Sequence, residues 1–182
     1  LDVIEALLEI VEVIPSGREL QRGRLLDVGY GNGSFIREAL DRGWDAFGND
    51  VNPTEYERVR RVPLPRPGIE PYRVITFFDS LEHFEVFEPV QGLADFTDWI
   101  IVSMPLPPWY FLSAVWKHLR PGEHHFYFRD PRSFEALFSS DRRAARIVYL
   151  ERPEDAIRGT LPDGLPNIQT IALRCESARD TL

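Results

Sequence analysis

The stretch that decides the fold is DVGYGNG, residues 27–33, a turn with a glycine at every second position. Residues 24–28 form a short apolar run typical of a strand, and residues 34–42 carry apolar side chains at helical spacing, with Ser34 suited to cap the helix. Trp44 to Val51 predicts a second strand. A strand, a helix and a strand in this order imply two parallel strands joined by a right-handed crossover.

Glycines in this turn allow a ligand to approach the main chain at the carboxyl end of the first strand, where open α/β sheets bind ligands. The spacing is G-x-G-x-G rather than the G-x-G-x-x-G of dinucleotide sites, and no Gly-Lys-Ser/Thr follows as in a P-loop. Asp50 ends the second strand, 23 residues after Asp27. A carboxylate there could accept both hydroxyls of a ribose. A solvated loop aspartate is the alternative.

The rest of the chain continues this alternation. Five prolines between residues 53 and 71 exclude a long helix there, so we expect an irregular link with a short helical turn over 54–61. Further strands are expected at 74–78, 99–103, 125–128, 146–150 and 168–173, and helices at 1–14, 81–87, 111–119 and 131–138.

One domain is expected over residues 1–182. It comprises an N-terminal helical segment (1–20), a core (24–175) and a polar tail (176–182). The 43% hydrophobic and 27% charged residues are ordinary globular composition, which excludes general disorder.

Charge argues about partners. There are 21 basic and 29 acidic residues, and the formal net charge of −8 disfavours a nucleic-acid partner. All basic residues except Lys117 are arginines, a bias that a GC-rich genome would produce and that also suits planar anion recognition. Four of them form a local basic stretch, either a solvated face or a site for an anionic substrate group: Arg58, Arg60, Arg61 and Arg66.

Cys175 is the single cysteine, so an internal disulfide and a cysteine zinc cluster are excluded, and its apolar surroundings indicate a buried side chain. No apolar run approaches the roughly 20 residues of a membrane span, and no signal-peptide pattern opens the chain. We therefore expect a soluble cytoplasmic protein without a membrane partner. The oligomeric state is open.

Several segments together resemble the class I S-adenosylmethionine-dependent methyltransferases. Residues 25–35 resemble their glycine-rich first motif, and residues 42–51 resemble the second strand with its ribose-binding acid. Residues 74–84 resemble the fourth strand with its Glu-His helix start, and residues 99–105 the fifth. Residues 121–128 resemble the segment before the last helix. The branch most similar is that of the ubiquinone-biosynthesis O-methyltransferases.

The resemblance covers about residues 1–175. It implies an α/β, Rossmann-like three-layer αβα sandwich around a mostly parallel seven-stranded sheet, in which residues 168–173 return antiparallel. It also implies S-adenosylmethionine as the cofactor. The cofactor-binding residues that it implies are Asp27, Gly29, Tyr30, Gly31, Gly33, Asp50 and Asp79.

Two departures from the family's pattern concern the cofactor pocket. Tyr30 stands where many relatives have a small residue, which predicts a ring that shapes the pocket over the methionine part of the cofactor. The third strand, at residues 62–65, lacks the usual adenine-contacting acid. Backbone or apolar contacts would then have to recognise the adenine.

Asp79, Glu82 and His83 form a D-x-x-E-H cluster after a predicted strand. Residues three and four apart face one way at a helix start, so two carboxylates and an imidazole could hold Mg²⁺ with waters completing its shell. Relatives with E-x-x-E-H, among them ubiquinone O-methyltransferases and small-RNA 2′-O-methyltransferases, use a metal in this way. A metal-free active-site role for His83, and simple capping or core packing, are the other interpretations.

His124 and His125 precede an aromatic strand, where alternation turns one of them inward. That histidine, with His83, is a candidate general base, and a structural histidine is the alternative. Residues 107–110, Pro-Pro-Trp-Tyr, are similar to a loop of amino-group DNA methyltransferases. They follow the fifth strand rather than the fourth, and Leu106 replaces the polar residue, so an apolar lid over a substrate is favoured.

These patterns predict an enzyme that methylates a small molecule, at a hydroxyl group, with His83, His124 or His125 assisting. Two alternatives stay open. A metal-assisted RNA 2′-O-methyltransferase would need an electropositive face, and a non-catalytic subunit would bind the cofactor without turnover.

Overall fold

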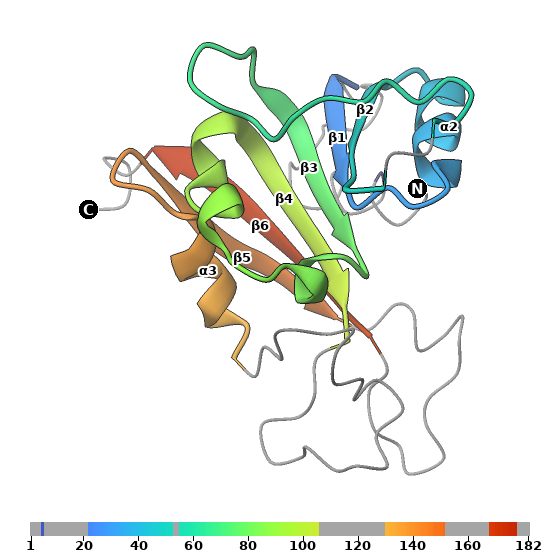
Figure 1. Ribbon diagram of the computed structural model, residues 1–182. Coiled ribbons are helices and arrows are strands. Elements are labelled where there is room, and N and C mark those ends of the chain that lie inside the picture. Colours follow the sequence, from blue (N-terminus) through green and yellow to red (C-terminus); the bar gives the residue numbers. More distant parts are fainter. Residues whose placement is uncertain (1–4, 6–21, 53–54, 106–129, 152–167, 178–182) are drawn as a thin grey trace, which may run out of the picture.

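The computed structural model describes residues 5, 22–52, 55–105, 130–151 and 168–177. Their centre is a six-stranded sheet with the strand order β2-β1-β3-β4-β6-β5 (Figure 1). The strands are β1 (Arg24–Val28), β2 (Asp45–Asn49), β3 (Tyr72–Phe78), β4 (Thr97–Met104), β5 (Arg143–Glu151) and β6 (Gln169–Ser177). The helices are α2 (Ser34–Asp41) and α3 (Arg132–Phe138), with the 3₁₀ turns η1 (Leu81–His83), η2 (Glu88–Val90) and η3 (Leu93–Phe96).

The predicted strand–helix–strand unit around the glycine turn is confirmed as β1-α2-β2. β1 and β2 pair in parallel, with Leu26 opposite Phe47. Helix α2 buries Ile36 and Ala39 against the sheet. Its N-cap is Gly33 in the left-handed region rather than Ser34, whose backbone N–H donates to the Asn32 side chain.

The sheet is mixed. β1 pairs in parallel with β2 and with β3, and β3 pairs in parallel with β4. β6 is antiparallel to both of its neighbours, β4 and β5, which confirms the antiparallel return expected at residues 168–173. The expectation of seven strands is not met within the described residues, which contain six. The strand expected at 125–128 lies outside them, as do the helix at 111–119 and, apart from Glu5, the helix at 1–14. Of the tail expected over 176–182, residues 176 and 177 belong to β6, and the others lie outside the described residues.

The third strand of the family pattern is reduced to one parallel bridge, between Gly48 and Arg61, at the edge beyond β2. Pro63 and Pro65 follow at once, and a proline has no N–H to donate to a neighbouring strand. The chain then crosses the sheet face with Leu64 packed on the core. On the outer side of β2, the sheet therefore continues only as this single bridge in the described part of the chain.

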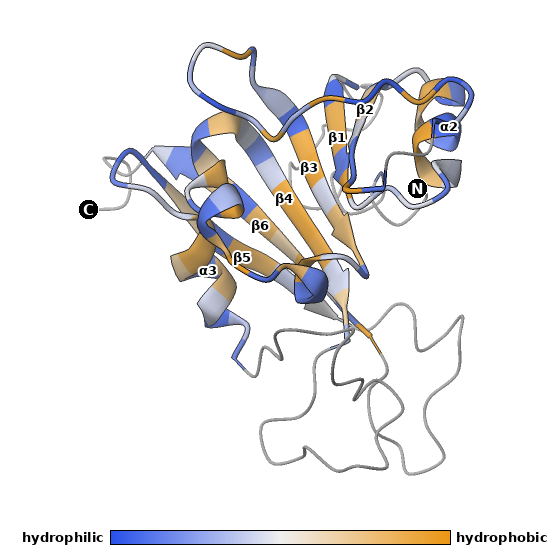
Figure 2. Cartoon of the chain, in the orientation of Figure 1, coloured by the Kyte–Doolittle hydropathy of each residue, from blue (hydrophilic) through white to orange (hydrophobic). Residues whose placement is uncertain are grey.

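Apolar side chains on the two faces of the strands form two cores. Figure 2 shows apolar residues along β3 and β4 at the centre of the sheet. On one face α2 packs with Leu25, Trp44 and Val74. On the other face α3 contributes Phe134 and Phe138, which stack on each other. Helices on both faces of a central sheet give the αβα layering that the resemblance implies.

Helices in the described part of the chain are short, and none is long and apolar enough to span a membrane. The helix expected at 81–87 is a single 3₁₀ turn, Leu81–His83, after which Phe84 is extended. Phe84 and Phe87 pack against the core, and Pro89 follows. Where a short helical turn was expected over 54–61, the described residues 55–61 contain a single turn at 57–58, in which the Val59 N–H donates to the Tyr56 carbonyl at 3.1 Å, and no helix.

Candidate functional site

The glycine turn places its main chain at the carboxyl end of β1. Gly29, Gly31 and Gly33 all have positive φ, a region that costs other residues free energy. A Cβ on Gly29 would lie 2.3 Å from the Cβ of Ser80, so the turn touches the loop after β3. A Cβ on Gly31 would meet no atom of the described residues within 4 Å. The turn is thus packed at its base and open at its middle glycine.

Asp50 lies beside this open glycine. Its Oδ2 accepts a hydrogen bond from the Gly31 N–H at 3.0 Å, and its Oδ1 accepts one from the Asn52 N–H at 2.7 Å. These bonds fix the orientation of the half-buried carboxylate. Each carboxylate oxygen has a second lone pair, so Asp50 keeps acceptor capacity for a ligand held over Gly31.

Asp27 is the buried acid of the site, 3% exposed within β1. Its Oδ1 accepts a hydrogen bond of 2.7 Å from the Thr76 hydroxyl on β3. Burial raises the pKa of Asp27 to about 7, against the lowering effect of that hydrogen bond, and the charge of Asp50 adds to the rise. A carboxyl group that titrates near neutral pH thus lies directly under the glycine turn.

The loop after β3 forms the opposite wall. Asp79 has φ 47°, a left-handed conformation that is uncommon for a non-glycine residue, and its N–H donates to the Ser103 carbonyl at 2.8 Å. The next residue, Ser80, donates its hydroxyl to the Val28 carbonyl at 2.6 Å. The strained corner brings the exposed Asp79 to the same edge of the sheet as the glycine turn.

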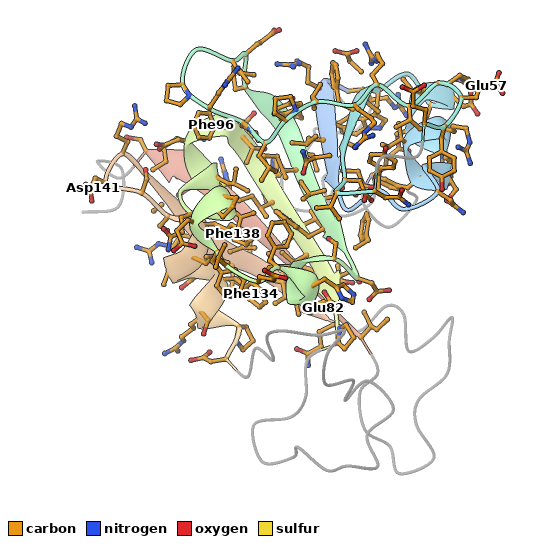
Figure 3. All side chains as sticks on the ribbon, viewed as in Figure 1. Glu57, Glu82, Phe96, Phe134, Phe138 and Asp141 are labelled. Carbon is orange, nitrogen blue, oxygen red and sulfur yellow. The ribbon has the colours of Figure 1, made fainter. Side chains whose placement is uncertain are left out.

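Glu82 follows on this loop, near the arrowheads of β3 and β4 (Figure 3). It is 2% exposed, and its Oε2 is buried without a hydrogen-bond partner. Burial raises the pKa of Glu82 to about 7, opposed by a hydrogen bond from its own backbone, and the charge of Asp79 adds to the rise. His83, by contrast, is exposed.

The predicted metal ligands are therefore not brought together. In the part of the chain that the structure describes, no three His, Cys, Asp or Glu side chains group closely enough to hold a metal ion. In the 3₁₀ turn the Glu82 side chain is buried, while those of Asp79 and His83 are exposed. The three side chains therefore do not share one face, as they would at the start of an α-helix.

Tyr30 occupies a place that the sequence did not indicate. Its ring is buried with Ile36 in the core under α2 and meets Tyr56 edge to face. A Cβ on Gly48 would lie 2.4 Å from this ring, so only glycine fits opposite it. The side chain of Tyr30 thus fills the α2 face of the sheet, and its main chain belongs to the glycine turn.

The basic stretch is largely committed to local contacts. Arg58 pairs with Asp41, Arg60 pairs with Asp45, and Arg61 donates to the backbone carbonyl of Asp50. These bonds favour a structural role over an open anion site. His124, His125 and the Pro-Pro-Trp-Tyr loop at 107–110 lie outside the described residues.

Two hydroxyl residues that sequence reasoning missed complete the site. Thr76 is fully buried among the apolar residues of β3 and binds Asp27, and Ser80 packs against Gly29. A single polar residue inside the run Val-Ile-Thr-Phe-Phe was the available signal, because a buried hydroxyl needs a partner. The sequence does not reveal that the partner is Asp27, since strand pairing decides it.

The features at this edge fit a nucleoside-bearing cofactor such as S-adenosylmethionine. The main chain is open above Gly31, and the adjoining Asp50 carboxylate is oriented by two amides. Side chains on Gly29 or Gly33 would collide with Ser80 or Val59, so the turn keeps its shape only with glycines there. An oriented carboxylate beside accessible backbone is the arrangement that binds a ribose in an α/β sheet.

A model of the methyltransferase domain family matches residues 2–158 of the sequence. The chain belongs to this methyltransferase family. The match covers most of the chain, including the glycine turn, Asp50 and the loop after β3. It confirms the prediction of a methyltransferase enzyme and does not single out the ubiquinone O-methyltransferase branch. No curated protein matches the sequence.

Solved structures share the methyltransferase fold at low sequence identity. A putative S-adenosylmethionine-dependent methyltransferase from Listeria monocytogenes is 15% identical, with a TM-score of 0.56, covering 97% of this chain and 99% of that one. Magnesium protoporphyrin IX methyltransferase from Synechocystis, with bound SAH, is 17% identical, with a TM-score of 0.58, covering 95% and 80%. Geranyl diphosphate C-methyltransferase from Streptomyces coelicolor is 14% identical, with a TM-score of 0.61, covering 95% and 81%.

Proposed function

We propose that this methyltransferase transfers a methyl group from S-adenosylmethionine to a hydroxyl group of a small molecule. The observation that carries the cofactor assignment is the bond between the Asp50 carboxylate and the amide of Gly31, a glycine of the turn whose Cβ position meets no described atom within 4 Å. A carboxylate oriented in this way, at the carboxyl end of two parallel strands, supports ribose binding by Asp50.

Within the proposed site, each residue has a distinct task. Asp50 accepts hydrogen bonds from the ribose hydroxyls, and the main chain at Gly31 lies against the cofactor. Asp27 and Thr76 support the turn from below, and Asp79 borders the site from the loop after β3. When bound, S-adenosylmethionine supplies an electrophilic methyl group on a positively charged sulfur. The protein then has to align the acceptor and exclude water.

A hydroxyl acceptor must lose a proton as its oxygen bonds to the methyl carbon. His83 is the described candidate to accept that proton, because it is exposed at the same edge as Asp79 and an imidazole nitrogen can accept a proton from a hydroxyl group. His124 and His125 are the other candidates from the sequence. Substituting each histidine separately by Gln distinguishes them. Loss of the general base should lower kcat more than it raises KM for the acceptor.

Charge supports a small acceptor. The formal net charge of −8 disfavours a polynucleotide, and two methyltransferases of similar fold are named for small molecules, magnesium protoporphyrin IX and geranyl diphosphate. The described residues do not fit a Mg²⁺ site made by Asp79, Glu82 and His83. Activity that persists in EDTA is the expected result.

Titration calorimetry with S-adenosylmethionine and its demethylated product, S-adenosylhomocysteine, tests the cofactor assignment. We expect saturable binding of both, and no binding at millimolar concentration would refute it. A screen of hydroxyl-bearing small molecules then tests the acceptor class, with and without EDTA. Cofactor binding without turnover of any acceptor would favour the non-catalytic subunit.

A further inference from the structure

A short piece of chain lies along the outer edge of β2, where the family pattern has its third strand. The Gly48 N–H donates to the Arg60 carbonyl and the Val62 N–H donates to the Gly48 carbonyl, both at 2.9 Å. The Asn49 side chain donates to the Val62 carbonyl at 2.9 Å. The main chain on both sides of Arg61 is therefore fixed to the end of β2.

The Arg61 side chain extends from this fixed base to the end of the strand. Its guanidinium donates to the backbone carbonyl of Asp50 at 2.9 Å. The Asp50 carboxylate is bonded to Gly31 and Asn52, so Arg61 adds a hold on the main chain of the same residue. The side chain of the next residue, Val51, is fully exposed and therefore does not anchor the main chain of Asp50 by packing.

The positive charge of Arg61 lies close to the base of the site. Burial raises the pKa of the Tyr30 phenol, and the charge of Arg61 opposes that rise while the charge of Asp50 adds to it. Arg61 itself is exposed. Through its N–H groups, the Arg61 guanidinium donates to a backbone carbonyl, whereas Arg58 in the same segment forms an ion pair with Asp41.

We propose that Arg61 is a positioning residue that holds Asp50 in the orientation needed to bind the ribose of the cofactor, in place of the missing third strand. The inference rests on the proposed function, because it assumes that Asp50 receives the ribose hydroxyls. Arg61 acts through the main chain of Asp50. Its loss should therefore weaken ligands that carry the ribose hydroxyls and spare a ligand that lacks them.

Titration calorimetry tests this with two ligands, S-adenosylhomocysteine and its 2′,3′-dideoxy analogue. The proteins are the natural chain, Arg61→Met and the control Arg66→Met, which removes an exposed arginine of the same segment. We expect Arg61→Met to bind S-adenosylhomocysteine about three- to tenfold more weakly, the size of one lost hydrogen bond. The analogue should change less than about twofold, and Arg66→Met should bind both ligands like the natural chain.

Three results would overturn the inference. Arg61→Met could bind S-adenosylhomocysteine like the natural chain, it could weaken both ligands equally, or Arg66→Met could reproduce the loss. Thermal unfolding of the three proteins checks that all of them are folded at the temperature of the titrations, so that equal weakening of both ligands counts against the inference. If the natural chain itself binds no S-adenosylhomocysteine, the proposed function fails, and that outcome is distinct from a failure specific to Arg61.

Discussion

Among the residues that the structure describes, acidic side chains at the amino edge of the sheet pair with arginines, whereas Asp27 and Asp50 at the carboxyl edge bond to a hydroxyl group and to backbone amides. At the amino edge, Asp45 at the start of β2 pairs with Arg24 and Arg60, and Asp98 at the start of β4 pairs with Arg73 at 3.0 Å. At the same edge, the guanidinium of Arg24 lies over the rings of Phe47 and Tyr72. These contacts satisfy the charges locally and bind strands to one another.

Glu5 shows how far this pairing goes. It accepts hydrogen bonds from Arg22, Arg42 and Trp44. Arg22 lies just before β1, and the other two lie just before β2. Burial acts to raise the pKa of Glu5, but these hydrogen bonds hold the pKa below its ordinary value. Its charge is therefore stabilised by the fold.

At the carboxyl edge, three acidic side chains have surroundings of another kind. Asp27 has the neutral Thr76 as its partner, Asp50 has backbone amides, and one oxygen of Glu82 has none. Burial raises the pKa of Asp27 and of Glu82 to about 7. Buried acids without cations cost stability, and such groups gather where a ligand binds. The contrast points to the same candidate site as the glycine turn, and Glu82 extends it to the loop after β3.

The largest effect that would test this comparison is the pH dependence caused by Asp27. Its ordinary pKa of 3.8 applies to the unfolded chain, and its native value is about 7. Between those values the native state keeps the proton and the unfolded state loses it, so stability falls as pH rises from about 4 to 7 and is level above. Asp27→Asn removes this contribution, which reaches about 4 kcal/mol.

Urea unfolding of both proteins between pH 4.5 and 8 measures it. The free energy of unfolding of the natural chain should fall relative to that of Asp27→Asn across this range. Glu82 titrates in both proteins and cancels in the difference. Parallel curves for the two proteins would show that Asp27 is not a protonated acid of the native state.

Gly29→Ala should have the next largest effect. Its Cβ would lie 2.3 Å from that of Ser80, and φ 78° strains any side chain, so we expect a loss of about 3 kcal/mol in unfolding free energy. Gly68→Ala is the matched control, with φ 91° and nothing within 4 Å, and should cost only about 1 kcal/mol. Equal losses in the two variants, measured by urea unfolding, would mean that the close approach of the two loops is unimportant.

Asp50→Ala should separate binding from stability. We expect S-adenosylhomocysteine to bind roughly tenfold or more weakly, because charge-assisted hydrogen bonds to the ribose are lost. The unfolding free energy should change by about 1 kcal/mol or less, since Asp50 is half-buried. Calorimetry and urea unfolding measure the two effects, and unchanged affinity would contradict the role assigned to Asp50.

Arg24→Ala should show the opposite separation at the amino edge. Its guanidinium lies 4.4 Å from the Tyr72 ring centroid and 4.9 Å from that of Phe47, and it pairs with Asp45. We expect about 1 kcal/mol lower stability and unchanged affinity for S-adenosylhomocysteine. A loss of affinity with stability intact would break the distinction between the two edges.

Much of the fold was predictable because its signals are local. The apolar run at residues 24–28, the glycine turn and the helical spacing after it lie next to one another in the chain, and β1-α2-β2 formed as expected. Asp50 also fell at the end of its strand, beside the turn. Short apolar runs likewise placed β3, β4 and β6 close to their predicted ranges.

Other parts depend on contacts between distant residues. The third strand shrank to the Gly48–Arg61 bridge because prolines follow, and Arg61 gained a contact with Asp50 that no spacing indicates. Glu82 and His83 diverged because a 3₁₀ turn, with a different pitch from an α-helix, formed after β3. Tyr30 entered the core opposite Gly48, where no larger residue leaves room.

The sequence by itself determined the strand–turn–helix–strand unit, the acid at the end of β2 and the methyltransferase family, because each depends on residues close together in the chain. Only the tertiary structure decided which acids are paired and which are buried alone. A carboxyl group takes its pKa and its partners from neighbours that strand pairing supplies, as Thr76 does for Asp27 from 49 residues away. Identical residue types therefore stabilise one edge of the sheet and form the candidate site at the other.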